Sequence, residues 1–206
     1  MVSTASDGAL LDAWRGGDAD AGRELFARHA AAVQRFFRSK LGAEREDLIQ
    51  RTFVACLESR DRVREGASFR TFLLTIARHK LYDHLERMHG PAGRFDPLVS
   101  SVAQLGAPSP SAIVAAQEDQ GFVLAAMQRL PLELQLVLEL HYWEELDTAA
   151  IAQVLGIPRG TVKTRLMRAR TSLRAELAAT RPELADADEP VVALTRGIGA
   201  ALGAAS

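Results

Sequence analysis

The sequence has little from which to build a catalytic or metal site. Cysteine occurs once, at Cys56, which excludes a disulfide framework and a thiolate zinc site. No Gly-rich phosphate loop, Ser/His/Asp set or pair of catalytic carboxylates stands out. We therefore expect no enzyme, no cofactor and no metal. A run of 18 apolar residues and a secretory signal are also lacking, so we expect a cytoplasmic protein without membrane insertion of its own.

An excess of charge of one sign is missing as well. The 25 Lys and Arg residues balance 26 Asp and Glu, a net charge of −1, which excludes a uniformly basic nucleic-acid binder. The balance hides one local concentration, because Arg159 to Arg174 holds six basic residues and no acidic one. A polyanion would respond to that stretch rather than to the total.

Proline is rare except in one window. Four of the eight prolines fall between Gly90 and Ser111, in a segment also rich in glycine and serine. This composition is typical of a flexible linker, which we place at 91–116. It separates two small domains, 8–90 and 117–180. A tail, 181–206, follows the second domain. Apolar residues recur every three or four positions and never alternate, so the predicted fold is all-α, with two helical domains.

Two helices of the N-terminal block matter for function. One begins near Glu46 and carries a predicted apolar stripe of Ile49, Phe53 and Leu57. The other is long, begins after Ser68, which can cap it, and ends at Gly90 before a proline.

A helix-turn-helix is predicted in the C-terminal block. Asp147 or Thr148 caps a short helix, 148–155, Gly156 occupies a tight turn, and a last helix runs from Arg159 to about Leu177. Its core-facing stripe is Val162, Leu166, Ala169 and Leu173. The outer face holds the side chains available to the major groove, which are Arg159, Thr161, Lys163, Thr164, Arg165 and Arg168. The alternative is a solvated basic helix of an ordinary all-α protein.

The segment EDLIQRTFVACLESRDRVREGASFRTFLLTIARHKLYDHLER resembles region two of the extracytoplasmic-function sigma factors of bacterial RNA polymerase. The helix-turn-helix resembles their region four, with no region three between. The resemblance implies a sigma factor that binds core polymerase at its beta-prime clamp and beta flap. It also implies recognition of a two-part promoter, assistance in DNA melting, and an anti-sigma partner.

The resemblance also assigns residues. It gives the polymerase contact to Asp47, Leu48, Gln50 and Phe53, and we expect Asp47, Gln50 and Val54 to share a helix face opposite Ile49 and Leu57. Recognition of the minus-ten element and melting fall to a set of basic and aromatic residues, Arg62, Arg64, Phe69, Arg70, Phe72, Arg78, Lys80 and Arg87. Minus-thirty-five recognition falls to the outer face of the last helix.

Several alternatives remain open at this point. Phe53, Phe69 and Phe72 have the helical spacing of core residues as well as that of contact residues. A stand-alone helix-turn-helix regulator would use the N-terminal block as a sensor or dimerisation module. A pure interaction protein would keep the fold without promoter recognition. The tail, with its acidic segment PELADADEP, is either disordered or an internal brake on the basic recognition helix.

Overall fold

The computed structural model describes residues 5–63, 68–89, 95–106, 118–185 and 188–204, and every regular element within these ranges is a helix. The N-terminal domain contains α1 (Asp7–Arg15), α2 (Ala19–Arg38), α3 (Arg45–Ser59), the 3-10 turn η1 (Arg60–Arg62) and α4 (Phe69–His89). The C-terminal domain contains α6 (Glu118–Arg129), α7 (Leu132–Tyr142), α8 (Thr148–Leu155) and α9 (Arg159–Thr180). The tail adds α10 (Pro182–Ala185) and α11 (Asp188–Ala204). The all-α prediction is confirmed.

Local sequence signals set several helix ends. The Asp18 carboxylate accepts hydrogen bonds from the amides of Asp20 and Ala21, and so caps α2. Asp147 caps α8 through the amides of Ala149 and Ala150. Gly156 ends α8 in the left-handed region, with φ of 65°, a conformation that a side chain disfavours. The predicted helix 148–155 and the turn after it are confirmed.

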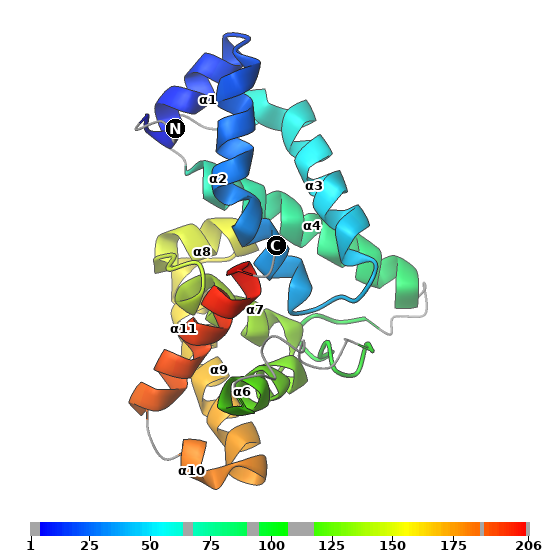
Figure 1. Ribbon diagram of the computed structural model, residues 1–206. Coiled ribbons are helices and arrows are strands. Elements are labelled where there is room, and N and C mark those ends of the chain that lie inside the picture. Colours follow the sequence, from blue (N-terminus) through cyan, green and yellow to red (C-terminus); the bar gives the residue numbers. More distant parts are fainter. Residues whose placement is uncertain (1–4, 64–67, 90–94, 107–117, 186–187, 205–206) are drawn as a thin grey trace.

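The two domains are packed against each other. Figure 1 shows the N-terminal domain above the C-terminal one, with α8 beneath α4 and α11 rising to the lower end of α2. Since α7 lies at this junction, its side chains meet both domains. One hydrophobic core therefore runs through the boundary, from Leu25 in α2 and Leu81 in α4 to Leu136 in α7.

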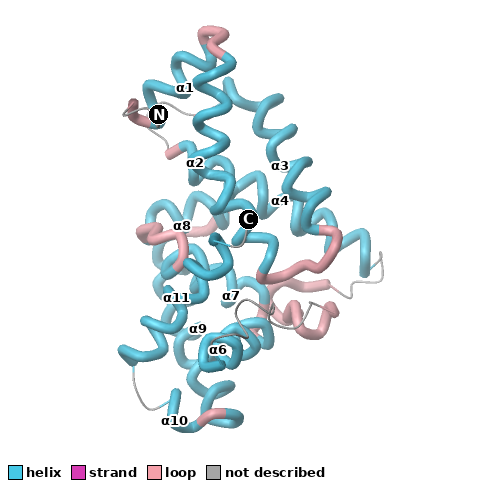
Figure 2. The backbone as a smooth tube through the Cα atoms, in the orientation of Figure 1, coloured by secondary structure: helices cyan, strands magenta, loops and turns pink. Residues whose placement is uncertain are grey.

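Part of the predicted linker belongs to this packed structure. Residues 95–106 form turns that lie beside the C-terminal domain (Figure 2). Val102 is buried, the amide of Leu132 donates to the Ser100 carbonyl at 2.9 Å, and the ring of Phe95 lies 6.0 Å from that of Tyr82. These apolar residues anchor a segment whose composition predicted flexibility. Residues 107–117 lie outside the described ranges.

The set of buried side chains on α3 differs in part from its prediction. Leu48, Thr52 and Cys56 are buried, whereas Leu57, expected on the apolar stripe, is 44% exposed. Small residues face inward because α3 packs closely against both α2 and α4. The Thr52 hydroxyl is satisfied locally, since it donates to the Leu48 carbonyl at 2.7 Å. Ile49 and Phe53, the other two residues of the predicted stripe, are half-buried and pack against the core, so the prediction is wrong only at Leu57.

Candidate nucleic-acid interface

The helix α9 has the expected division into a buried and an outer face. Its four predicted core residues are all buried, Val162, Leu166, Ala169 and Leu173. On the other side, Arg159, Lys163, Thr164 and Arg168 are exposed, and Thr161 is half-buried. The guanidinium of Arg159 donates to the Thr148 hydroxyl at 3.3 Å, which ties the start of α9 to α8. The N-terminal half of α9 thus presents cations and hydroxyls together, the groups that contact phosphates and base edges.

Arg165 differs from its neighbours on α9. Its guanidinium forms an ion pair with Glu133 of α7, and the side chains of the two residues are only 16% and 6% exposed. In this arrangement Arg165 is directed into the protein and is not available to DNA.

The basic residues of α4 divide in a similar way. Arg70 pairs with Glu144, and Arg78 lies 3.8 Å from Glu133 and stacks on the Tyr82 ring at 4.6 Å. By contrast, Arg87 is exposed and donates to the Asp83 carbonyl, while Lys80 is half-buried. Two of the predicted minus-ten cations therefore face the other domain.

Three glutamates from α7 and the turn after it receive these cations. We call Glu133, Glu139 and Glu144 the interdomain carboxylates; their side chains are 6%, 3% and 5% exposed. Each has a partner in the N-terminal domain. Glu144 accepts two hydrogen bonds from Arg35, at 2.8 and 3.0 Å, in addition to its pairing with Arg70.

The central carboxylate is the most deeply buried. Glu139 pairs with Lys40 of the N-terminal domain and accepts from the Ser39 hydroxyl at 2.9 Å and from the Gln135 amide at 2.7 Å. Burial raises the pKa of Glu139 and lowers that of Lys40, while each charge opposes the shift of the other. Such a pair is costly to break because either partner alone would be a buried charge.

Tyr82 joins the Glu133 cluster from α4. Its hydroxyl donates to the Glu133 carboxylate, and burial, reinforced by that carboxylate, raises the pKa of Tyr82. The phenol therefore stays protonated and acts as a donor across the domain boundary.

A cavity of about 420 Å³ lies beside the start of α4. It is lined by residues of both domains, Arg62, Val63, Ser68, Thr71, Phe72, Thr75 and Gln153. The half-buried Phe72 contributes an aromatic ring, and the buried Thr71 hydroxyl has no hydrogen-bond partner among the described residues. Phe69 belongs instead to the core, 1% exposed and packed on Trp14 at 6.4 Å. Arg64, also predicted here, lies outside the described residues.

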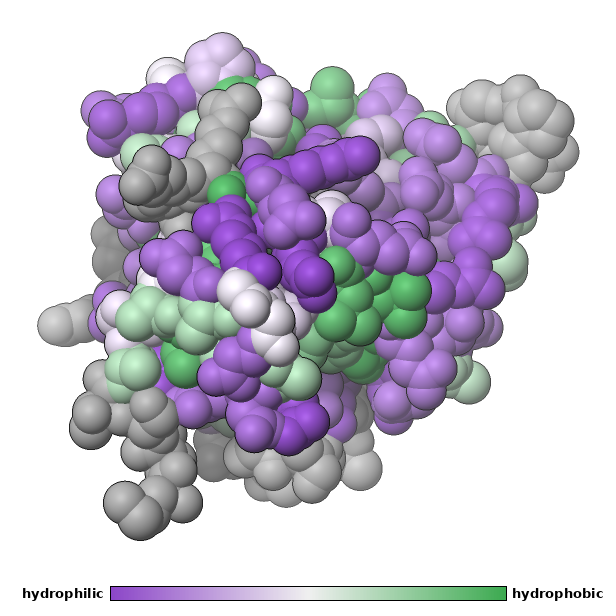
Figure 3. All heavy atoms as spheres, turned by 90° about the horizontal axis from the view of Figure 1, so that it is seen from above, coloured by the Kyte–Doolittle hydropathy of each residue, from purple (hydrophilic) through white to green (hydrophobic). Residues whose placement is uncertain are grey.

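The outer face of α3 combines polar and apolar side chains. Asp47 and Gln50 are exposed beside Val54 and Leu57, which are 51% and 44% exposed. Leu57 therefore lies with this face and not opposite it, as its periodicity had suggested. Leu48 is 1% exposed, so it packs in the core and has no surface to offer. Seen from above, the molecule is mostly hydrophilic with a compact hydrophobic patch (Figure 3).

The half-buried Phe53 lies between the core and this face of α3. Its ring meets that of Phe26 at 5.2 Å. Packing within the domain therefore explains why an apolar residue stands at this position.

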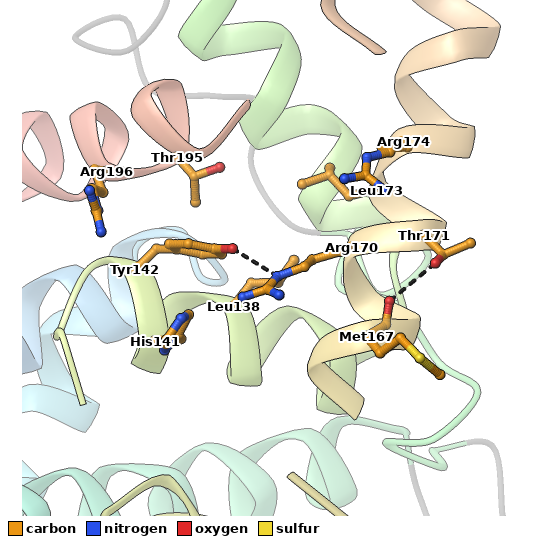
Figure 4. A pocket seen from close by; sticks show the side chains of 10 residues that line it. All are labelled: Leu138, His141, Tyr142, Met167, Arg170, Thr171, Leu173, Arg174, Thr195 and Arg196. Carbon is orange, nitrogen blue, oxygen red and sulfur yellow. Dashed lines mark hydrogen bonds between the residues drawn. The ribbon is translucent and has the colours of Figure 1, made fainter. Parts of the chain in front are cut away.

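A second cavity, of about 570 Å³, lies between α7, α9 and α11. Figure 4 shows Arg170 of α9 reaching Tyr142 of α7, whose hydroxyl accepts from its Nε at 2.9 Å, with Arg196 of α11 on the other side. Across the described ranges, no three His, Cys, Asp or Glu side chains are grouped to hold a metal ion. None of the described helices combines the length and continuous apolar character that crossing a bilayer requires.

Comparison with known proteins matches both domains to one family. The family model described as sigma-70 region 2 matches residues 25–89, and that described as sigma-70, region 4 matches residues 123–173. The ECF RNA polymerase sigma factor SigL of Mycobacterium tuberculosis is 34% identical over 160 residues, which cover 75% of this chain and 88% of SigL. The RNA polymerase sigma factor CarQ of Myxococcus xanthus is 31% identical over 180 residues, covering 85% and 99%.

A solved structure of CnrH in complex with the cytosolic domain of CnrY has a TM-score of 0.64 at 25% identity and covers 84% of this chain and 98% of its own. The sigma factor RpoE of Bartonella quintana, solved with the anti-sigma factor NepR, has a TM-score of 0.58 at 23% identity, covering 79% and 99%. The latter likeness is one of fold.

Proposed function

The chain belongs to the extracytoplasmic-function (ECF) family of RNA polymerase sigma factors, which direct promoter-specific transcription initiation, and we propose how its surfaces divide this task. The observation that carries the proposal is the pair of basic helices, one in each domain, α4 and α9. A two-part promoter requires two separate reading surfaces on one subunit. The polymerase forms the phosphodiester bonds of the RNA, and the complex acts in the cytoplasm.

In this proposal α9 reads the minus-thirty-five element. The exposed Arg159, Lys163 and Arg168, with Thr164 and the half-buried Thr161, form the contact surface. Arginine can bond guanine through two donors, and threonine can contact phosphate or a thymine methyl. Arg165 joins them only after it leaves Glu133.

The cavity beside α4 captures a flipped base of the minus-ten element. Unstacking a base costs a few kcal/mol, which an aromatic ring and hydrogen bonds at the new site must offset. Phe72 supplies the ring, Arg62 the charge, and the unpartnered Thr71 hydroxyl a hydrogen bond. The role proposed for Phe69 is to support α4 from the core.

The outer face of α3 contacts the polymerase clamp. Asp47 and Gln50 give it polar specificity, and the exposed Val54 and Leu57 give it apolar area, the mixture typical of protein interfaces. The beta flap is assigned to the C-terminal domain. By analogy with CnrH and RpoE, each solved with a partner, we also expect an anti-sigma factor.

Polymerase binding tests the function directly. The purified chain, mixed with sigma-free core polymerase, should co-elute from a filtration column and support promoter-directed transcription. Val54→Asp should weaken co-elution at least tenfold, because it buries a charge in the interface. Ala27→Asp, which adds the same charge at an exposed position of α2, is the control. A chain that binds DNA but ignores polymerase would instead be a stand-alone regulator.

Base capture is tested at Phe72. Phe72→Ala should reduce promoter opening, read from permanganate reactivity of unpaired thymines, while Phe72→Tyr preserves stacking and should retain it. Thr71→Val removes only the unpartnered hydroxyl and should give a smaller loss. Equal opening by Phe72→Ala and the unmodified chain would remove Phe72 from the base pocket.

A further inference from the structure

The tail helix α11 lies outside the part of the chain that the family models match, which ends at residue 173. It nevertheless packs against three helices of the folded domains, α2, α6 and α7. Figure 1 shows it crossing the C-terminal domain and ending beside the lower part of α2. A single segment of 17 residues thus touches both domains.

Specific contacts hold α11 at this position. Thr195, Ile198 and Leu202, spaced by three and four, are buried on its inner face. At its last turn, Arg38 of α2 donates to the Leu202 carbonyl at 2.8 Å, one of the carbonyls that a helix end leaves without an internal partner. The N-terminal domain therefore caps the C-terminal end of the tail helix.

Three glycines let α11 approach closely. A Cβ at Gly197, Gly199 or Gly203 would lie 2.7 Å from the Gln120 side chain, 2.7 Å from the Trp143 ring, and 2.6 Å from the Arg35 guanidinium, respectively. Glycine weakens an isolated helix, so three within seven residues make α11 depend on the surface it docks against. Gln120 and Trp143 belong to one domain and Arg35 to the other.

The docked helix reaches one residue of the interdomain ion pairs, Arg35. Arg35, which Gly203 approaches, is the residue that grips Glu144, and Glu144 also holds Arg70. The neighbouring carboxylate Glu133 holds Arg165 and lies 3.8 Å from Arg78. The arrangement that α11 bridges is therefore one in which two cations assigned to DNA, Arg70 and Arg78, meet carboxylates of the other domain.

We propose that α11 is an intramolecular clasp, which docks across α2, α6 and α7 and holds the two domains in a closed state that cannot engage a promoter fully. The inference rests on the proposed function, since it concerns access to the same DNA-binding residues. Release of α11 lets the domains separate and frees Arg70 and Arg78, whose carboxylate partners lie in the other domain.

The contact between α11 and the C-terminal domain includes a cavity at the middle of α11. At its middle, Arg196 of α11 faces the 570 Å³ cavity that Arg170 of α9 also lines, so two like charges border a gap instead of a packed contact (Figure 4). The packing between α11 and the C-terminal domain is therefore not continuous along the helix.

Gly199→Leu tests the clasp by forcing α11 away from Trp143. The matched control is Ala200→Leu, which adds the same side chain at the adjacent exposed position. Leucine favours helix more than glycine does, so any release comes from the clash and not from a weaker helix. We expect Gly199→Leu to increase the radius of gyration in small-angle scattering and to bind a labelled random-sequence duplex about tenfold more tightly. Ala200→Leu should stay within twofold of the unmodified chain.

A reversible lock tests the same idea in the opposite direction and does not depend on the folding of Gly199→Leu. An ideal Cβ at position 203 lies 3.6 Å from Cγ of Arg35, the atom that a cysteine sulfur replaces, so Arg35→Cys with Gly203→Cys can form a disulfide after small adjustments. Cys56 does not compete, because burial raises the pKa of its thiol to about 12.

Oxidised, the double variant should lose at least tenfold in promoter-directed transcription with core polymerase, and reduction should restore it. Gly203→Cys alone, treated in the same way, is the control. Full activity of the oxidised lock, or closed scattering and unchanged duplex binding of a folded Gly199→Leu, would overturn the clasp. Failure of the unmodified chain to bind core polymerase would instead overturn the proposed function, whatever α11 does.

Discussion

The helices α4 and α9 are both long and basic and both bury an apolar stripe, yet their cations are in different situations. On α9, Arg159, Lys163 and Arg168 are exposed, whereas Arg165 is paired with Glu133 of the same domain. On α4, Arg70 and Arg78 both meet interdomain carboxylates. The recognition helix is therefore largely ready for DNA, whereas the helix assigned to melting is held back.

This difference shows that a basic sequence does not establish an available basic surface. Whether a guanidinium can reach a phosphate depends on which carboxylate already holds it, and for the α4 cations those carboxylates come from the other domain. It also suggests an order of events, in which α9 can meet DNA before α4 is free.

The largest expected effect is on stability, and it distinguishes a buried ion pair from an exposed one. Lys40→Met should destabilise the protein by about 3–5 kcal/mol, because it leaves Glu139 as a buried, unpaired charge. Arg51→Met breaks the half-exposed pair with Asp47 and should cost less than about 1 kcal/mol. Urea unfolding curves measure both. Similar losses in the two variants would mean that the Lys40 pair is not a buried linkage between domains.

Charge reversal on α9 tests the more available helix. Arg165→Glu combined with Arg168→Glu should lower promoter-directed transcription by about 100-fold, since two contacts become repulsive, and should leave binding to core polymerase intact. Arg23→Glu, at an exposed site on α2, is the control for the effect of reversing one charge away from α9. Transcription that survives the double reversal would show that α9 is not the recognition helix.

Removing the charge of Glu133 should make the cations of α4 and α9 more similar in their availability to DNA. Glu133→Gln removes the charge that engages Arg165 and Arg78, and we expect duplex affinity to rise roughly three- to tenfold. Glu176→Gln makes the same change of net charge at the more exposed pair with Arg129. An equal increase in both variants would mean that only net charge, and not release, was measured.

Salt dependence gives the smallest and most quantitative difference. If Arg159, Lys163 and Arg168 alone meet phosphates, log K should fall with log salt at a slope of about −2.7, and at about −3.6 once Arg165 joins as a fourth. Titrations of duplex binding for the unmodified chain and Glu133→Gln should therefore differ by about one unit of slope. Identical slopes would contradict an Arg165 that is withheld from DNA.

Local chemistry made much of the fold predictable. The helix-turn-helix followed from the Asp147 cap, the left-handed Gly156 and the buried stripe beginning at Val162, all of which act within a few residues. The buried face of α3 was predicted only in part, through Ile49 and Phe53, because Thr52 and Cys56 are inward only where α2 and α4 pack closely on it. Phe69 and Phe72 have equal hydropathy, and their separation into core and cavity lining depends on neighbours distant in sequence.

The sequence by itself determined an all-α chain in two parts, the turn before the recognition helix and the resemblance to a sigma factor, because caps, periodicity and motifs are short-range properties. Only the tertiary structure decided which cations are free and where α11 docks. Ion pairs such as Arg35–Glu144 join residues 109 positions apart, and no local pattern encodes a contact whose free energy depends on burial shared by two domains.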